Sequence, residues 1–390
     1  SIVKTATQIP LTFYRKSGSA EGIIDNVSVK EVTRDNVPRI DYTGGGCPHI
    51  LAEPQRTNLF EYSESFNNIE WSRSSVTVVD NSSQSPDGTN NASLMYPSSS
   101  GNFRYIHNST TASSSIYTIS AFVKASGKNV VWFYINSGSS NGYIYYDLSD
   151  QTTQVIAGST GTPIGTIVSY GNDWYKISFT SGTAMTVSSG SGIGVSDAKG
   201  DPAVTTNGTD GVLVWGLQLE QGSYATSYIP TSGSTVTRNQ DIFTRDGIGS
   251  LINSTEGVLF VELNFGQIDS DARYISVSDG TTNNRAIFGI EANESKLRYY
   301  FSNGGSLVVN KNYLLPDISI FNKVAIKWKL NDFALWLNGV EVASVTSGTT
   351  PLAGTFNILN FTSGGSSQRF FGKVRQLQVY DTALTDEQLL

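Results

Sequence analysis

The stretch that most constrains the fold is residues 211–243. Its first half, Val212 to Leu219, is strongly apolar and has the length of one strand. The second half is rich in Ser, Thr and Gly and contains Pro230, which cannot donate a backbone hydrogen bond to a sheet. We therefore expect one domain to close near Gly222 and an extended connector to lead into a second domain.

Both sides of this connector have the pattern of an all-β protein. Short runs rich in Val, Ile, Tyr and Phe alternate with turn sequences such as SSQSPDGTNN and NSGSSNG. The chain has 390 residues, which is enough for two β-sandwiches. The sequence thus predicts an all-β fold of tandem antiparallel β-sandwiches.

The predicted organisation has five parts. Residues 1–32 contain a hairpin too small to bury a core of its own. It is either the C-terminal strands of a preceding sandwich, which we prefer, or an edge added to the next one. Residues 33–57 are rich in Pro and Gly and indicate a linker. The rest divides into a first sandwich at 58–232, a linker at 233–249 and a second sandwich at 250–390.

Composition excludes several classes of partner. The formal net charge of −7 and the absence of a Lys/Arg block argue against binding to nucleic acid or an anionic membrane. No apolar run approaches the ~18 residues that a membrane span needs. The single Cys47 excludes an internal disulfide. Because the chain starts at Ser1 without Met, we expect a processed or partial chain.

Two neighbouring strands of the first sandwich carry aromatic residues on one face. Alternate residues of a strand point to opposite faces, and the aliphatic set has to face the core. Four aromatic side chains are then left on the outer face, namely Trp132, Tyr134, Tyr143 and Tyr145. Such rings stack on the apolar faces of sugars, while Asn, Ser and Asp bind hydroxyls. The alternative is that another layer, a loop or a subunit covers this face.

The second sandwich offers one further aromatic candidate. In LWLNGVEV, Leu335 and Leu337 are expected to point inward, so Trp336 points outward. The following Asn338-Gly339 pair predicts a tight hairpin turn. Near the C-terminus, Thr385 and Gln388 have the spacing of a capping box that opens a short helix.

Three segments of the first sandwich are similar to a known module. They are EPQRTNLFEYSESFNNIEW at 53–71, SPDGTNNAS at 85–93 and GLQLEQGSYATSYIPTSGSTVTR at 216–238. Together they resemble a jelly-roll module of phage tail and head fibres, which is itself similar to carbohydrate-binding jelly rolls. The fragment EGIIDNVSVKEV at 21–32 resembles the last strand of another copy. Residues 255–390, with LWLNGVEV and the terminal LTDEQL, resemble a concanavalin A-like, laminin-G-type sandwich.

Neither of the two resembling regions contains a catalytic signature of its family. Glycosidases of the concanavalin A-like fold carry an E-x-D-x-E strand, and this sequence has none; Glu256 and Glu262 merely bracket an apolar run. The arginine, histidine and tyrosine signatures of polysaccharide lyases are also absent. Residues 138–142 match G-x-S-x-G, but they link two strands, whereas a nucleophile elbow joins a strand to a helix. We therefore predict no catalytic residues and no enzyme activity.

Metal sites receive little support from the sequence. Two His residues and one Cys do not supply the usual zinc ligands. A structural Ca²⁺ is the one cofactor considered, since carbohydrate-binding jelly rolls often hold one and Asp87 and Asp210 are suitable oxygen donors. The alternative, that both residues belong to ordinary Asp-Gly turns, is favoured. No cofactor is therefore predicted.

The resemblances imply a function outside the cell. They indicate a non-enzymatic phage virion protein, a fibre, spike or decoration component on the virion surface, that acts as an adhesin for bacterial cell-surface glycans. Its other partners would be virion proteins and copies of itself, since such fibres are commonly homotrimers. Two alternatives stay open: an accessory carbohydrate-binding region of a secreted bacterial polysaccharide-degrading enzyme, and a structural spacer without a ligand.

Overall fold

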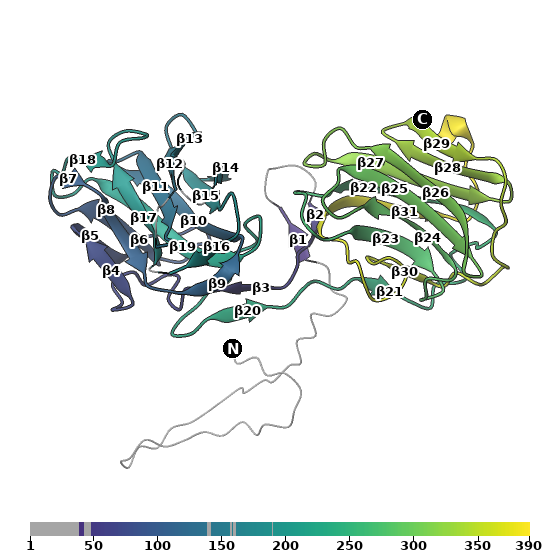
Figure 1. The fold of residues 1–390 in the computed structure, drawn as a ribbon, viewed down its shortest axis with the longest axis horizontal. Coiled ribbons are helices and arrows are strands. Elements are labelled where there is room, and N and C mark those ends of the chain that lie inside the picture. Colours follow the sequence, from purple (N-terminus) through teal and green to yellow (C-terminus); the bar gives the residue numbers. More distant parts are fainter. Residues whose placement is uncertain (1–38, 43–47, 139–141, 157, 159–160, 189) are drawn as a thin grey trace, which may run out of the picture.

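The computed structural model describes residues 39–42, 48–138, 142–156, 158, 161–188 and 190–390. It consists of two antiparallel β-sandwiches and one short helix, α1 (Asp386–Leu389), so the predicted fold class is confirmed. Figure 1 shows the sandwiches as separate bodies joined by extended segments. The hairpin predicted within residues 1–32 lies outside the described residues. Within the described part, no helix is long and apolar enough to cross a membrane.

The first sandwich consists of two six-stranded sheets. One contains, in spatial order, β14 (Ile164–Gly171), β15 (Trp174–Thr180), β10 (Tyr117–Ser126), β19 (Gly211–Gln221), β6 (Ala92–Pro97) and β5 (Val76–Ser83). The other contains β13 (Thr152–Ile156), β12 (Tyr143–Asp147), β11 (Val130–Ile135), β17 (Ser191–Ser196), β8 (Arg104–Asn108) and β4 (Trp71–Ser74). Two short pairs complete it: β7 (Gly101–Asn102) with β18 (Ala203–Val204), and β9 (Ala112–Ser115) with β16 (Met185–Val187).

The core of the first sandwich lies between these sheets and follows the period of two. Phe133, Ile144 and Ile193 point inward from adjacent strands and are completely buried. Val214 and Leu219 meet them from β19, which contains the apolar strand predicted at residues 212–219. Burial of apolar side chains on one face of each sheet stabilises the sandwich and fixes its register.

The second sandwich has one seven-stranded and one six-stranded sheet. The larger contains β1 (Arg39–Asp41), β2 (His49–Ala52), β31 (Gly372–Tyr380), β22 (Glu256–Asn264), β27 (Asn322–Lys329), β28 (Asp332–Leu337) and β29 (Val340–Val345). The smaller contains β21 (Thr244–Arg245), β30 (Ile358–Asn360), β23 (Arg273–Ser278), β24 (Arg285–Ile290), β25 (Lys296–Asn303) and β26 (Ser306–Leu314).

Two local predictions in this sandwich are confirmed. Asn338 and Gly339 both have positive φ, 51° and 81°, as a tight hairpin between β28 and β29 requires. The backbone N–H of Thr385 donates to Gln388 Oε1 at 2.9 Å, which forms the capping box at the start of α1.

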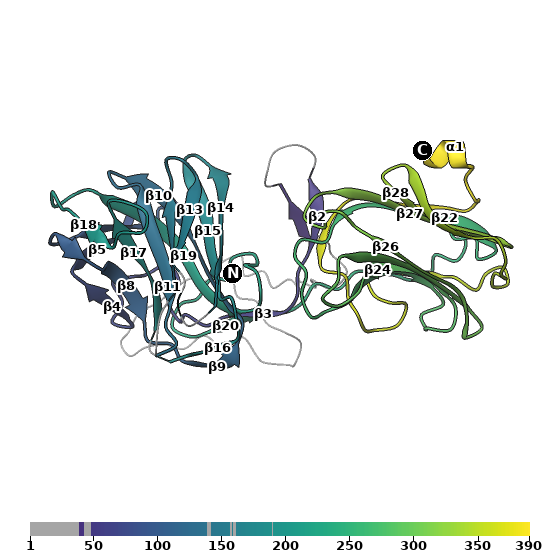
Figure 2. The same cartoon turned by 45° about the horizontal axis from the view of Figure 1, so that its top comes forward.

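The predicted linker at residues 33–57 is where the structure differs most from expectation. Strand β2 pairs with β31, with Ile50 opposite Val374, so this segment extends the seven-stranded sheet of the second sandwich. The chain then runs through β3 (Arg56–Asn58) into the first sandwich and returns through β20 (Val236–Arg238). Strands β3 and β20 pair with each other, and Figure 2 shows them at the lower right of the first sandwich, where the chain passes towards the second. The first sandwich is thus inserted between two parts of the second, and two chain segments connect them.

A buried carboxylate ties these two segments together. Glu53 is 8% exposed and accepts a hydrogen bond from Arg39 Nη2 at 2.9 Å and one from the Ser227 backbone N–H at 2.8 Å. Arg238 of β20 forms a further ion pair with it at 3.1 Å. Asp241, in turn, accepts from Arg39 Nε at 3.0 Å and from the Glu53 backbone N–H at 2.7 Å. We call these residues, Arg39, Glu53, Arg238 and Asp241, the connector network.

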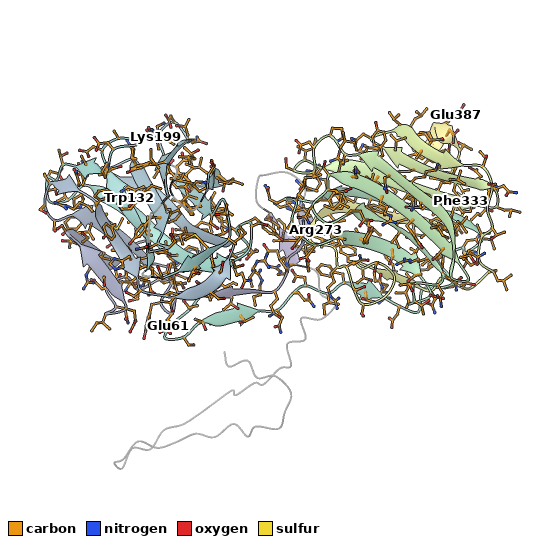
Figure 3. All side chains as sticks on the ribbon, in the orientation of Figure 1. Glu61, Trp132, Lys199, Arg273, Phe333 and Glu387 are labelled. Atoms are coloured by element: carbon orange, nitrogen blue, oxygen red, sulfur yellow. The ribbon has the colours of Figure 1, made fainter. Side chains whose placement is uncertain are left out.

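A tyrosine adds a contact from the connector to the second sandwich. Tyr224 follows β19, and its ring lies 5.5 Å from the guanidinium carbon of Arg56 and 5.8 Å from that of Arg273. Arg273 belongs to β23 and is buried at the end of the second sandwich that faces the first (Figure 3). Cation–π contacts of this kind stabilise by about 0.5–2 kcal/mol each.

We predict that Glu53→Gln destabilises the protein by about 3 kcal/mol, because it leaves two arginines beside a neutral amide. Burial raises the pKa of Glu53, but Arg238 and Arg39 lower it more, so the net pKa lies below its ordinary value. The unfolded state therefore binds the proton more tightly. This part of the stability should be complete above about pH 4.3 and should be lost as pH falls through the folded pKa. Urea unfolding between pH 3 and pH 7 measures both effects.

The matched control is Glu294→Gln, which removes an exposed ion pair with Lys296 at 3.1 Å. An exposed pair contributes at most about 1 kcal/mol, so this variant should unfold almost like the wild type. Equal, small effects from both variants would show that the connector network does not stabilise the fold.

Candidate functional site

The outer face of the sheet β13-β12-β11-β17-β8-β4 presents two rows of side chains. The first row crosses the strands as Ser74, Tyr105, Gly194, Trp132, Tyr145 and Gln154. The second, two residues along each strand, is Ser72, His107, Gly192, Tyr134, Tyr143 and Ile156. The four aromatic residues predicted to share an outer face are therefore brought together, and β11 and β12 are adjacent.

Two glycines in β17 make this face concave. A Cβ atom at Gly194 would lie 2.2 Å from the indole carbons Cε2 and Cζ2 of Trp132, so the indole occupies the space that a side chain would fill. At Gly192 a Cβ would lie 2.0 Å from the Ile106 carbonyl oxygen. Because β17 presents no side chain at these two positions of the outer face, the rings from β8 and β11 lean over a depression. We call this depression the aromatic groove.

Trp132 forms the floor of the aromatic groove and not an exposed platform. It is 1% exposed, and the rings of Phe103, Tyr105 and Tyr143 lie 6.0, 5.6 and 5.6 Å from its centroid. Edge-to-face pairs at such distances are attractive and hold the ring in place. Trp132 thus lies on the predicted outer face, but neighbouring rings cover it. Phe103, at 40% exposure, forms the rim.

The other predicted aromatic residues differ in accessibility. Tyr134 and Tyr145 are buried, and Tyr143 is half-buried beside Phe103 at 6.0 Å between ring centroids. Burial and the neighbouring Tyr143 and Asp201 raise the pKa of Tyr145 to about 12. Burial also raises the pKa of Tyr134 well above its ordinary range. These two phenols thus stay protonated and uncharged at physiological pH.

The lining of the aromatic groove is polar but uncharged. The groove holds about 370 Å³ and is lined by Ser74, Asn102, Phe103, Tyr105, His107, Trp132, Tyr134, Asn136 and Tyr143. Among these described lining residues there is no Lys, Arg, Asp or Glu. Burial lowers the pKa of His107, so its imidazole is neutral at pH 7. Its Nδ1 and the Trp132 Nε1 are buried without a hydrogen-bond partner in the described structure.

Several of these residues were missed by sequence reasoning. Phe103, Tyr105 and His107 lie in or beside β8, which neighbours β11 only through the intervening β17. The alternation of Tyr105 and His107 with buried Ile106 predicts that the first two share the outer face. The sequence gives no local sign of the strand order that places them across from Trp132.

The remaining tryptophans have separate locations. Trp71 and Trp328 are core residues whose Nε1 atoms donate to the carbonyls of Tyr62 and Asn253. Trp174 and Trp215 form a small cluster on the outer face of the other sheet of the first sandwich. Trp336 lies on the outer face of the seven-stranded sheet, as its phase predicted, but it is only 5% exposed.

The two glutamates that bracket the apolar run of β22 have cationic partners. Glu256 pairs with Lys329 at 3.2 Å, and Glu262 pairs with Arg375 at 2.7 Å. Nothing in this arrangement supplies the pair of carboxylates that glycoside hydrolysis requires.

The two residues considered for calcium take part in turns. Asp87 Oδ1 accepts hydrogen bonds from the Ser85 hydroxyl at 2.6 Å and from the Thr89 backbone N–H at 2.8 Å. Asp210 lies against Gly127, and its backbone N–H donates to the Asn207 side chain at 2.9 Å. The described residues contain no group of three or more His, Cys, Asp or Glu side chains that could hold a metal ion. His49, for its part, contacts Asp41 at 3.1 Å.

The comparisons with known proteins identify the fold of the second sandwich. Residues 261–390 match the family model described as the concanavalin A-like lectin/glucanases superfamily. Over these residues the second sandwich is similar to concanavalin A-like domains. A search of curated proteins found no match to the chain.

Three solved structures resemble parts of the chain. The CBM40 domain of the Ruminococcus gnavus IT-sialidase, bound to α2,3-sialyllactose, is 19% identical over 35% of this chain and 80% of its own, with a TM-score of 0.30. A heptameric SAP-like pentraxin from Limulus polyphemus is 17% identical over 36% of this chain and 70% of its own, with a TM-score of 0.28. The LG4-5 domains of the mouse laminin α1 chain are 10% identical over 74% of this chain and 92% of their own, with a TM-score of 0.26. Sequence identities and TM-scores this low give no information on the ligand or the assembly of this chain.

We predict that Gly194→Ala displaces the Trp132 indole and destabilises the protein by about 1–3 kcal/mol, because the added methyl group overlaps the ring. Chemical unfolding followed by tryptophan fluorescence measures the loss. Near-ultraviolet circular dichroism reports the altered packing of the ring. Gly365→Ala is the control, since its nearest heavy atom would be 3.9 Å away and its φ is not positive. Identical behaviour of the two variants would contradict the geometry of the groove.

Proposed function

We propose that this chain is a non-enzymatic structural protein of a bacteriophage virion, a fibre, spike or decoration component that attaches to glycans on the bacterial surface. The observation that carries the proposal is the aromatic groove. It is concave, it combines exposed ring edges with amide and hydroxyl groups, and it contains buried polar atoms without partners.

The chemistry of the aromatic groove matches that of a sugar. A pyranose ring has an apolar C–H face, which stacks on aromatic rings such as Phe103 and Tyr143, and a rim of hydroxyls. Asn102, Asn136 and His107 lie where they can bind such hydroxyls. A volume of about 370 Å³ lies within the ordinary range of small-ligand sites. Because no described lining residue is charged, we expect the preferred ligand to be a neutral saccharide.

The virion role draws support from the sequence motifs of the first sandwich. The segments at 53–71, 85–93 and 216–238 resemble a jelly-roll module of phage fibres. Such fibres are commonly homotrimers, and three copies of a weak site would bind a repetitive polysaccharide far more tightly than one copy does. On this proposal the chain acts outside the cell, on the virion surface, beside other virion proteins.

The alternative is that these domains are the accessory carbohydrate-binding region of a secreted bacterial enzyme. The superfamily of the second sandwich includes both lectins and glucanases in its description. The complete open reading frame and its neighbours separate the two proposals. Virion-attachment segments, fibre repeats and neighbouring virion genes favour the first, and a secretion signal with a catalytic domain favours the second.

We predict that Tyr143→Ala weakens glycan binding about tenfold, since it removes one stacking ring from the rim, equivalent to about 1.4 kcal/mol. The measurement is binding of the full chain to an array of bacterial surface polysaccharides. Tyr313→Ala is the matched control, because Tyr313 is a solvent-accessible tyrosine that lies outside the groove, on β26 of the second sandwich.

Two results would contradict the proposal. Equal binding by both variants would show that the ligand does not bind in the aromatic groove. An absence of binding by folded protein would favour the spacer interpretation, in which a neighbouring subunit covers the aromatic face.

A further inference from the structure

The rim of the aromatic groove contains a strained backbone conformation. Phe103 has a φ of 56°, in the left-handed region that residues with a β-carbon rarely adopt. Asn and Asp tolerate this region, and they account for most of the other described non-glycine residues with positive φ. Phe103 is the only aromatic residue among them. Strain of this kind persists only where the surrounding structure enforces it, and it clusters at binding sites.

The side chain of Arg104 enforces the conformation of the preceding loop. We call residues 98–103 the rim loop. The Arg104 guanidinium donates hydrogen bonds to three of its backbone carbonyls, those of Ser99 at 2.9 Å, Ser100 at 2.8 Å and Asn102 at 2.7 Å. All three guanidinium nitrogens are thus directed at the rim loop. Hydrogen bonds from a charged donor are stronger than those between neutral groups, so this clasp is firm.

The rim loop is shaped to receive the guanidinium. Gly101 has a φ of 137°, and a Cβ atom there would lie 2.4 Å from Arg104 Nη2, so only glycine leaves room for this contact. On the other side of the loop, β7 pairs with β18 (Figure 1). The Phe103 backbone N–H donates to the Pro202 carbonyl at 3.1 Å, and the Ser74 hydroxyl donates to the Phe103 carbonyl at 3.3 Å. The backbone of Phe103 is therefore fixed from several directions.

The Phe103 ring lies outside the core that this loop closes. It is 40% exposed and does not belong to the cluster of buried residues between the two sheets. Its centroid lies 6.0 Å from that of Trp132 and 6.0 Å from that of Tyr143, at the mouth of the aromatic groove. A glycine or asparagine at this position would close the loop with less strain. The aromatic ring at a strained position therefore indicates a contact with something outside the chain's own core.

We propose that Arg104 is a positioning residue of the aromatic groove, and that its guanidinium holds the rim loop so that the Phe103 ring is the main stacking surface for a saccharide. The inference rests on the proposed function and deepens it. Arg104 is not one of the residues that line the groove, so it acts through Phe103. Because the rim loop is ordered before binding, a ligand does not have to order it, and this preorganisation raises affinity.

The first measurement reports the position of the Phe103 ring and needs no ligand. The full chain is labelled with ¹⁵N in tryptophan only, and Trp132→Phe assigns the Trp132 indole N–H signal in the nuclear magnetic resonance spectrum. Arg104→Ala should shift or broaden this signal, because the Phe103 ring beside the indole is no longer held in one place. The Trp71 signal should stay unchanged, since Trp71 lies in the core of the same sandwich and donates to the Tyr62 carbonyl at 2.8 Å.

The second measurement is binding of each variant to an array of bacterial surface polysaccharides. Phe103→Gly should weaken binding at least about tenfold, because it removes the stacking ring. The midpoint of its urea unfolding should stay near the wild-type value, because relief of the strain offsets the lost ring contacts. Arg104→Ala should weaken binding at least about fivefold. Arg104→Lys should recover only part of this loss, because an ammonium group cannot reach three carbonyls in the geometry of a guanidinium.

The matched control is Arg73→Ala. Arg73 is also an arginine of the first sandwich that fastens a loop, and its Nη1 donates to Asn67 Oδ1 at 2.8 Å. It makes this contact with a different loop and does not line the aromatic groove. Arg73→Ala should therefore bind polysaccharide like the wild type and leave the Trp132 signal in place.

The outcomes separate this inference from the proposed function. Equal binding by the wild type, Phe103→Gly and Arg104→Ala overturns the inference and leaves the proposed function standing. An unchanged Trp132 signal in Arg104→Ala overturns the positioning role of Arg104. No binding by the folded wild type overturns the proposed function and this inference with it. If Arg104→Ala loses the Trp71 signal through unfolding, Arg104→Lys and Phe103→Gly decide in its place.

Discussion

The ion pair between Glu53 and Arg238 is the interaction on which the arrangement of this molecule depends. One partner belongs to the segment that leaves the second sandwich, and the other to the segment that returns to it. Because Glu53 is buried, removing either partner leaves a charge that water cannot easily solvate. The pair therefore adds to the β3–β20 pairing and to the Asp241 hydrogen bonds, which tie the two segments at the point where they run side by side.

The candidate function follows from how sheets are built. The outer face of a sandwich sheet is normally polar, and the aromatic groove arises where small residues interrupt a row of large ones. Gly192 and Gly194 do this between β8 and β11. The Trp132 ring lies on the floor of this groove, and amides and hydroxyls are among the groups that line it. That combination suits a ligand with one apolar face and a polar edge.

Local rules predicted a large part of this structure. Period-two alternation placed Trp132 and Tyr134 opposite Phe133, and the Asn338-Gly339 and Thr385–Gln388 signals gave the correct turn and cap, because each depends on residues close in sequence. The aromatic groove itself was beyond reach. It requires β17 to pair with β11 and β8 to pair with the other edge of β17, although these strands are far apart in sequence, and only the complete sheet order shows this. Alternation also gives the face on which Trp132 lies but not what covers that face.

The predicted linker at residues 33–57 differs from the structure for the same reason. A segment rich in Pro and Gly gives no local sign that it will pair with β31, whose sequence lies more than three hundred residues away. Only the edge of the second sandwich makes that pairing favourable, because an open strand edge leaves backbone groups unpaired. Long-range pairing thus decided the role of β1 (Arg39–Asp41) and β2 (His49–Ala52), and composition did not.

The most direct test of the central claim is hydrogen–deuterium exchange of the full chain, with and without a surface polysaccharide to which it binds. The account predicts slower exchange in β8 and in the β11–β12 hairpin, whose side chains line the aromatic groove, with no change in the core strand β19. Protection confined to other parts of the chain, or none at a saturating concentration, would contradict it.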